Sequence, residues 1–405
     1  MLIGLDILMQ QQVISANPAL LRWARRTAGL SVQDAVLRAK IGKQRQRKNE
    51  ESTTAEEQLI SWEEGRAAPS LTQLKALANV YRRPLVTFFL PKPPTEVAQL
   101  MDYRTVPNTP QESTEFAALK RRIYQLHREL NAIAKEEERE PLSFVGSCTM
   151  RDGVFSTVDT IRSVLTFCAD EIHNSSCDTF CILRDKIQRA GVYIILMGDL
   201  GNYKSKVTPD EFRGIAIAHP IAPLVVINSY DTQAAMLCTL VHELAHIFLG
   251  SSGISNQNVF ESRSLHQPIE QFCNSVAAEF LVPDETLRSS WNEHQREDLE
   301  ISIARLARIF GVSSEVITRR LFDLRRIKEE DYQRLIALYQ ARWESNKKRH
   351  IRGGPNANSA RYNLGRKTLS TISRAVDEGL ITLLDAARAL NMSVSRFEKI
   401  ARDDI

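Results

Sequence analysis

Apolar residues recur at helical spacing along the first 95 residues, in short stretches separated by polar or glycine-containing breaks. Each stretch opens with a residue typical of a helix start: Asn17 before Pro18, Ser31 before Val32, and Ser70 after Pro69. The segment PLVTFFLPKPP ends this part of the chain, and its prolines interrupt the pattern. We therefore predict a small helical domain over residues 1–95, followed by a polar helical spacer over residues 96–142.

The periodicity changes after residue 143. A helical stretch over residues 158–190 is followed by three short β-rich runs, GVYIILMG, FRGIAIA and APLVVINS. Two apolar helices are then predicted over residues 232–249 and 267–281, and Pro283 ends the second. Strands followed by helices indicate the α+β class. We predict one mostly helical domain with a small sheet over residues 143–300.

The remaining chain returns to helical periodicity. The segment LARIFGVSSEVITRRLFDLRRI has the rhythm of a helix-turn-helix, which predicts a helical domain over residues 301–345. A basic, glycine-containing linker with the sequence ARWESNKKRHIRGGPN comes next. A final pair of helices is expected from about Ser359 to Ala401, so that residues 346–405 form a linker and a helical pair.

Composition excludes several classes of protein. The 405 residues are 43% hydrophobic and 25% charged, as in ordinary soluble proteins, and the net charge is only +4. Apolar runs stay well short of the roughly 20 residues that a membrane span needs, and the start MLIGLDILMQQQ lacks the basic region of a secretory signal. Six cysteines without a CxxC pair fit reduced thiols. We expect a cytoplasmic protein without membrane contact, and its oligomeric state stays open.

One motif carries chemistry. His242, Glu243 and His246 form an HExxH sequence within the first of the two apolar helices. Residues four apart project from the same face of a helix, so both imidazoles can bind one metal ion while Glu243 lies beside it. The flanking sequence LCTLVHELAHIFLG is apolar, and burying three polar groups there is costly unless something pairs with them. The motif therefore favours a metal site over a solvated helix surface.

The next helix offers a third ligand. Glu270 and Asn274 are four residues apart, so Glu270 could complete the set with His242 and His246 while Asn274 orients a ligand from behind. Three protein ligands leave a fourth position for water, as in catalytic zinc sites. Glu243 would then act as general base toward a water that the metal activates. The chemistry predicted is hydrolysis of an amide bond.

The sequence FRGIAIA…PLVVINS…CTLVHELAHIFLG…IEQFCNSVAAEFLVP resembles the ImmA/IrrE metallopeptidase family over about residues 150–283. The resemblance implies a gluzincin-like zinc peptidase with His242, His246 and Glu270 as ligands and Glu243 as base. It also implies a protein substrate, typically a helix-turn-helix repressor whose cleavage derepresses genes during stress or mobile-element excision. Zinc is the expected metal, with manganese or another divalent ion as the alternative.

The N-terminal helices resemble the Xre/Cro-type helix-turn-helix through NPALLRWARRTAGLSVQDAVLRAKIG and QLISWEEGRAAPSLTQLKALANVYRRPLVTFFLP. The polar insertion KQRQRKNEESTT precedes the expected recognition helix, Ala55–Glu63, and Glu56 and Glu57 on that helix would oppose phosphate. DNA binding and protein recognition therefore both stay open. The candidate DNA contacts are Lys43, Arg45, Arg47, Lys48 and Arg66.

A peptidase also needs a group that stabilises the tetrahedral oxyanion. The sequence does not rank the candidates, which are His219, Tyr203, His266 and Arg213.

Three functions follow. The first is a metal-dependent endopeptidase that cleaves a repressor-type regulatory protein. The second is a DNA-binding transcription regulator whose peptidase-like domain senses a metal or ligand. The third is an antitoxin or immunity partner that holds a toxin by protein contact.

Overall fold

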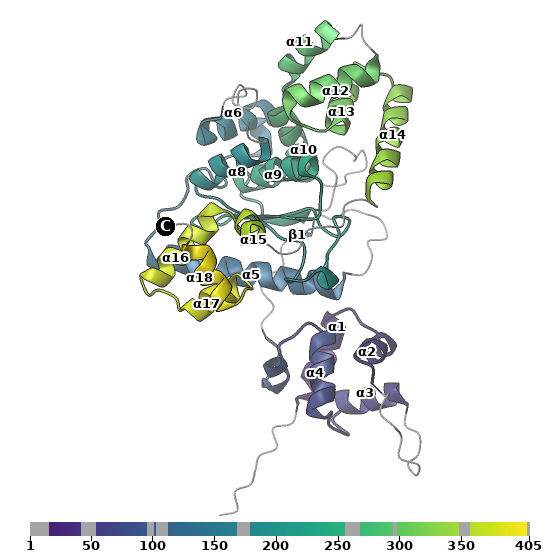
Figure 1. The fold of residues 1–405 in the computed structure, drawn as a ribbon, viewed down its shortest axis with the longest axis vertical. Helices are drawn as coiled ribbons and strands as arrows, with labels where there is room; N and C mark the ends of the chain where they lie inside the picture. The colour runs from purple at the N-terminus through teal and green to yellow at the C-terminus, as the bar shows by residue number, and fades with distance from the viewer. Residues whose placement is uncertain are drawn as a thin grey trace, which may run out of the picture. The chain divides into compact units, whose positions relative to one another are not determined.

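In a computed structural model, residues 16–41, 54–94, 101–102, 112–167, 179–255, 268–294, 298–347 and 357–402 are described. The chain divides into two compact units, which Figure 1 draws from purple to yellow along the chain. Unit 1 comprises residues 1–98 and 110–120, and unit 2 comprises residues 99–109 and 121–405. The five domains expected from the sequence are a finer division, which stays a prediction.

Unit 1 is built from short helices around one apolar core. They are α1 (Pro18–Thr27), α2 (Val32–Ala39), α3 (Ala55–Glu63), α4 (Leu71–Val80) and the 3-10 helix η1 (Leu85–Phe89). The side chains of Asn17, Ser31 and Ser70 accept backbone hydrogen bonds at the helix starts, as the sequence predicts. Leu20, Leu59 and other fully buried apolar side chains form the core.

Unit 2 contains a mixed five-stranded sheet. Its strands are β1 (Met101–Asp102), β2 (Tyr193–Leu196), β3 (Gly214–Ile217), β4 (Leu224–Ile227) and β5 (Gly253–Ser255), in the order β1-β5-β3-β4-β2. β3 is antiparallel to both β4 and β5, whereas β2–β4 and β1–β5 pair in parallel. The α+β class is confirmed. The three β-rich runs form β2, β3 and β4, but β1 and β5 were not predicted.

Helices cover both faces of this sheet. α9 (Gln233–Phe248) and α10 (Pro268–Leu281) pack against each other on one face, together with α6 (Val154–Leu165) and α8 (Thr179–Arg189). α5 (Thr114–Glu136) runs along the opposite face (Figure 1), where the His127 ring lies 3.1 Å from the carbonyl oxygen of Ala222. α9 is thus enclosed by the sheet and by neighbouring helices.

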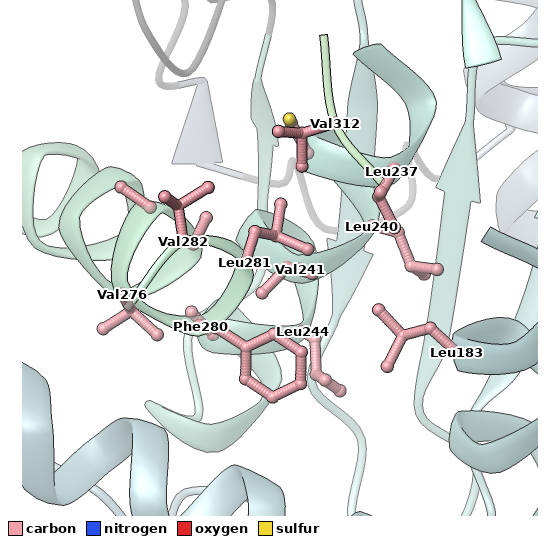
Figure 2. Close-up of a cluster of buried hydrophobic side chains, with 14 of the residues drawn as sticks. Leu183, Leu237, Leu240, Val241, Leu244, Val276, Phe280, Leu281, Val282 and Val312 are labelled. Atoms are coloured by element: carbon pink, nitrogen blue, oxygen red, sulfur yellow. The ribbon is translucent and has the colours of Figure 1, made fainter. Parts of the chain in front are cut away.

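The core of unit 2 lies between α8, α9 and α10. Figure 2 shows Leu240 and Val241 of α9 beside Leu183 of α8 and Leu281 of α10, with Val312 closing one end. Burying a large aliphatic side chain stabilises the fold by about 1.5 to 3 kcal/mol. Because these contacts surround α9, they hold the HExxH motif on a rigid element.

The second half of unit 2 is helical. Its helices are α11 (Asp284–His294), α12 (Leu299–Phe310), α13 (Ser314–Asp323), α14 (Glu329–Lys347), α15 (Ala357–Leu364), α16 (Arg366–Asp377), α17 (Leu383–Ala389) and α18 (Val394–Arg402). Two 3-10 helices, η2 (Met150–Asp152) and η3 (Tyr203–Ser205), lie earlier in the unit. The expected final pair was wrong, because residues 357–402 form four helices. In the described part of the chain, no helix is both long and apolar enough to cross a membrane.

Of the last four helices, α15 and α16 pack on the edge strand β2, and α17 and α18 pack on these two helices. Arg184 Nη2 donates to the carbonyl oxygens of Ile194 in β2 (3.0 Å) and Asn363 in α15 (3.1 Å). Gln188 Oε1 accepts from the backbone of Lys367 in α16 (3.1 Å). An uncovered edge strand exposes backbone groups that can pair with other chains. These helices therefore belong to unit 2 and protect one edge of its sheet.

Candidate metal centre

Helix α9 presents the HExxH motif from inside the core. Thr232 caps its start by accepting from the backbone N–H of Ala235 (3.2 Å), and every residue from Met236 to Phe248 is buried. His242 and His246 are each 1% exposed, and Glu243 is fully buried. Ionisable groups at such depth need a partner, because an isolated buried charge is strongly destabilising.

Helix α10 supplies the partner. Glu270 lies in its first turn and is fully buried against α9. Its Oε2 is 3.3 Å from Nε2 of His242, and its Oε1 is 3.0 Å from Nε2 of His246. The two Nε2 atoms are 3.1 Å apart. The structure thus brings the three predicted ligands together, with ligand atoms that all lie within 4.8 Å of one another.

The ionisable groups of this cluster shift the pKa values of one another. Burial raises the pKa of Glu270, but the imidazoles of His242 and His246 lower it more, to about 2. Burial lowers the pKa of His242, but the carboxylates of Glu270 and Glu243 and the side chain of Asn274 raise it overall. Without a bound cation, the cluster therefore favours a carboxylate beside a protonated imidazole.

The donor set fits a divalent cation. Two imidazoles and one carboxylate are the ligands of catalytic zinc sites. In the described structure, Nδ1 of His242 and both carboxylate oxygens of Glu270 are buried without a hydrogen bond of good geometry. The atoms that face one another are the two Nε2 nitrogens and the Glu270 oxygens, and one proton can lie between only two of them, whereas a cation at their centre would bind all three side chains. The cluster could therefore hold a metal ion.

Asn274 lies one turn after Glu270 and is half-buried. Its side chain raises the pKa of His242 through a side-chain hydrogen bond, although the geometry of this contact is poor and the buried Oδ1 has no well-aligned donor among the described residues. That position agrees with the orienting role expected from the sequence, which stays a prediction.

The structure describes the side chains of two of the four candidates for stabilising the oxyanion, and these two have different partners. The His219 ring packs edge-on against His127 of α5, at 5.3 Å between centroids, and is not part of the histidine and glutamate cluster. Arg213 immediately precedes β3, where its Nη1 donates to Asp231 Oδ2 (2.7 Å). Tyr203 lies in η3, but its side chain is outside the described structure, as is the whole of His266.

Sequence reasoning missed Asp231. Its carboxylate is mostly buried, and burial raises its pKa although Arg213 acts in the opposite direction. It directly precedes the N-cap Thr232 of α9. An acidic residue at a helix start is the one signal in the sequence, and it does not reveal the distant arginine partner.

The candidate DNA contacts are mostly outside the described residues, which is the case for Lys43, Arg45, Arg47 and Lys48. Arg66 is described: its Nε donates to Glu64 Oε2 (2.7 Å), and its side chain is 65% exposed. The hypothesis of DNA contact therefore stays open.

Residues 187–322 match the sequence model of the Peptidase_M78 family, described as the IrrE N-terminal-like domain. The matched segment contains His242, Glu243, His246 and Glu270 and extends through most of α13. No curated protein matches the chain. The match supports a peptidase-like domain within unit 2, and a metallopeptidase family implies a divalent metal. It ends later than the boundary at residue 300 expected from the sequence.

Proposed function

We propose that unit 2 is a zinc-dependent endopeptidase. The observation that carries this proposal is the convergence of His242, His246 and Glu270 next to the buried Glu243, inside a segment that matches a peptidase family. Two nitrogen ligands and one oxygen ligand suit zinc, although manganese or another divalent ion can occupy such a set.

Each residue then has a role. His242, His246 and Glu270 would hold the cation, which would supply Lewis acidity that lowers the pKa of a water to about 7. Glu243 accepts the proton of the attacking water and delivers it to the leaving amine. The apolar environment of α9 strengthens these electrostatic interactions, because little solvent competes for the same groups. The group that stabilises the developing negative charge of the oxyanion stays one of the four candidates named from the sequence.

The test of this mechanism is Glu243→Gln, assayed against a quenched-fluorescent peptide library with zinc added. We expect peptide cleavage to fall by at least about 100-fold, because a positioned general base contributes about 10²- to 10⁴-fold. The matched control is Glu285→Gln in the exposed first turn of α11, which should keep full activity. If Glu243→Gln cleaves at the wild-type rate, the proposed mechanism is wrong.

We further propose that the substrate is a repressor-type regulatory protein in the cytoplasm and that unit 1 takes part in recognising it. The first turn of α3 carries exposed Glu56 and Glu57, and α3 contains no lysine or arginine. Such a helix is unfavourable next to phosphate, which supports protein recognition over DNA binding. Cleavage of a copurified regulator, lost in Glu243→Gln, would support this proposal. Salt-dependent DNA binding without any cleavage would instead favour the transcription regulator, and stoichiometric toxin capture would favour the antitoxin.

A further inference from the structure

We propose that Gly214 is a positioning residue for Glu243: its missing side chain provides the space in which the carboxylate of the base lies. This inference rests on the proposed function only where it concerns catalysis. It assigns a role to a residue outside the HExxH helix, on the strand that covers the motif.

The backbone of Gly214 is held from both sides. It is the first residue of β3, where it pairs with Ile227 of β4 and with Ser255 of β5. The preceding carbonyl, of Arg213, accepts from the backbone N–H of Asn228 (2.9 Å). Because neighbouring strands flank it on either side, β3 cannot shift sideways to make room for a larger residue.

A side chain at this position would meet Glu243. A Cβ atom built on Gly214 would lie 2.2 Å from Oε1 and 2.6 Å from both Cδ and Cγ of Glu243. Carbon atoms in ordinary contact are about 3.5 to 4.0 Å apart. The overlap therefore includes half of the glutamate side chain and not just its tip.

Backbone conformation does not explain the glycine. Gly214 lies in a regular antiparallel strand and is not among the glycines with positive φ in the described structure. Any residue can adopt such backbone angles. Space for Glu243 is therefore the reason for glycine at this position.

Glu243 has little freedom to move away. Its side chain is fully buried, and the adjacent α9 residues Leu240, Val241 and Leu244 are all buried in the core. Close packing of this kind transmits an added methyl group into a displacement of its neighbours. The carboxylate of Glu243 would have to leave its place beside His242.

The experiment is a double-mutant cycle with Gly214→Ala in the wild-type and Glu243→Ala backgrounds, on the full chain. In the wild-type background, we expect the melting temperature to fall by roughly 2 to 8 °C, as overpacking predicts. In the Glu243→Ala background, the same substitution should have almost no effect, since the atoms it overlaps have been removed. An equal loss in both backgrounds would overturn the proposal.

Catalysis gives a second readout. Gly214→Ala should lower kcat for a cleaved peptide by about 100-fold with little change in KM, because a displacement of about 1 Å in a catalytic group has that effect. Zinc content should stay at one ion per chain. The matched control is Ala216→Gly, a one-methyl change two residues along the same strand, which should lower stability while kcat stays within about threefold. An unchanged kcat in Gly214→Ala would contradict the positioning role.

The two proposals fail separately. If the protein cleaves no peptide, the endopeptidase assignment fails, while the melting-temperature cycle still decides whether Gly214 makes room for Glu243. If the protein is active but the cycle shows no coupling, the role of Gly214 is wrong and the peptidase assignment stands.

Discussion

Unit 1 and unit 2 each bury a carboxylate on a helix, but they surround it differently. In unit 1, Glu63 is 5% exposed and accepts from Arg25 Nε (2.7 Å) and Arg25 Nη2 (2.8 Å). In unit 2, Glu270 is fully buried and its ion-pair partners among the described residues are the imidazoles of His242 and His246.

The difference separates a structural ion pair from a candidate metal site. A bidentate arginine engages both oxygens of its carboxylate in a fixed geometry, so the charge of Glu63 is already balanced by a permanent cation. Imidazoles can lose their protons and bind a metal through the same nitrogen atoms, so the cluster around Glu270 has two chemical states. Burial of a carboxylate therefore indicates little about function until its partners are known.

The largest expected effect comes from removing the carboxylate of Glu270 from the cluster that it forms with His242 and His246. Glu270→Gln should lower zinc affinity by more than about 100-fold, since loss of a direct ligand exceeds the 10- to 100-fold typical of residues behind the ligands. Isothermal titration of the metal-free protein measures this. His219→Gln, a histidine outside the cluster, should bind zinc like the wild type. Equal zinc affinity in Glu270→Gln and the wild type would exclude Glu270 as a ligand.

Breaking the ion pair of Glu63 with Arg25 should instead lower the free energy of unfolding of unit 1. Glu63→Gln leaves the mostly buried Arg25 guanidinium without its counter-charge, which should destabilise unit 1 by about 3 kcal/mol. Urea unfolding followed by the fluorescence of Trp23 and Trp62 reports on this unit, while zinc affinity should be unchanged. A loss of stability below about 1 kcal/mol would show that the pair is not what holds α1 to α3.

Much of this comparison could be predicted from sequence, because local periodicity determines it. The helices carrying His242 and Glu270 and the strands β2, β3 and β4 agree with their predicted ranges to within a few residues. The buried setting of HExxH also followed from its apolar neighbours. The spacing of four residues placed both imidazoles on one face without any knowledge of the tertiary structure.

The rest depends on contacts between distant residues. β5 is only three residues long and β1 only two, and they are strands because of what they pair with. Helix α15 packs on β2 through Arg184 and backbone carbonyl groups, which leave no periodic signal. Similarly, nothing in the sequence around Gly214 reveals that Glu243 occupies the space beside it. Local patterns predict elements, whereas these features require the assembled fold.

His127 extends the comparison to a partly buried imidazole, whose described neighbours include the Ala222 carbonyl and the His219 ring. Burial, and to a lesser degree the neighbouring His219, lowers the pKa of His127 to about 4, whereas His242 has its pKa raised. The unfolded chain binds a proton near pH 6.5 and the folded chain only near pH 4, so stability is fully present above pH 6.5 and falls between these values. Because each pKa unit corresponds to about 1.4 kcal/mol, the loss between pH 7 and pH 4.5 should amount to roughly 2 to 3 kcal/mol. Urea midpoints at pH 7 and pH 4.5 measure it.

Replacing the ring isolates this effect from the many carboxylates that also titrate in acid. His127→Gln should reduce the difference between the two pH values by most of that amount, while His242→Gln, measured on metal-free protein, should not. An unchanged pH difference in His127→Gln would show that its burial does not control acid stability.

The smallest expected effect concerns an exposed carboxylate next to the ion pair of Glu63 with Arg25. Glu64 follows Glu63 directly, is 42% exposed and accepts from Arg66, whose side chain is 65% exposed. Exposed ion pairs contribute little because solvent screens them, so Glu64→Gln should change the stability of unit 1 by less than about 0.5 kcal/mol. The same variant removes a negative charge beside Arg66, one of the residues expected to contact DNA. If unit 1 binds DNA through this region, Glu64→Gln should bind a random-sequence duplex more tightly at low salt, whereas unchanged and negligible binding would favour protein recognition.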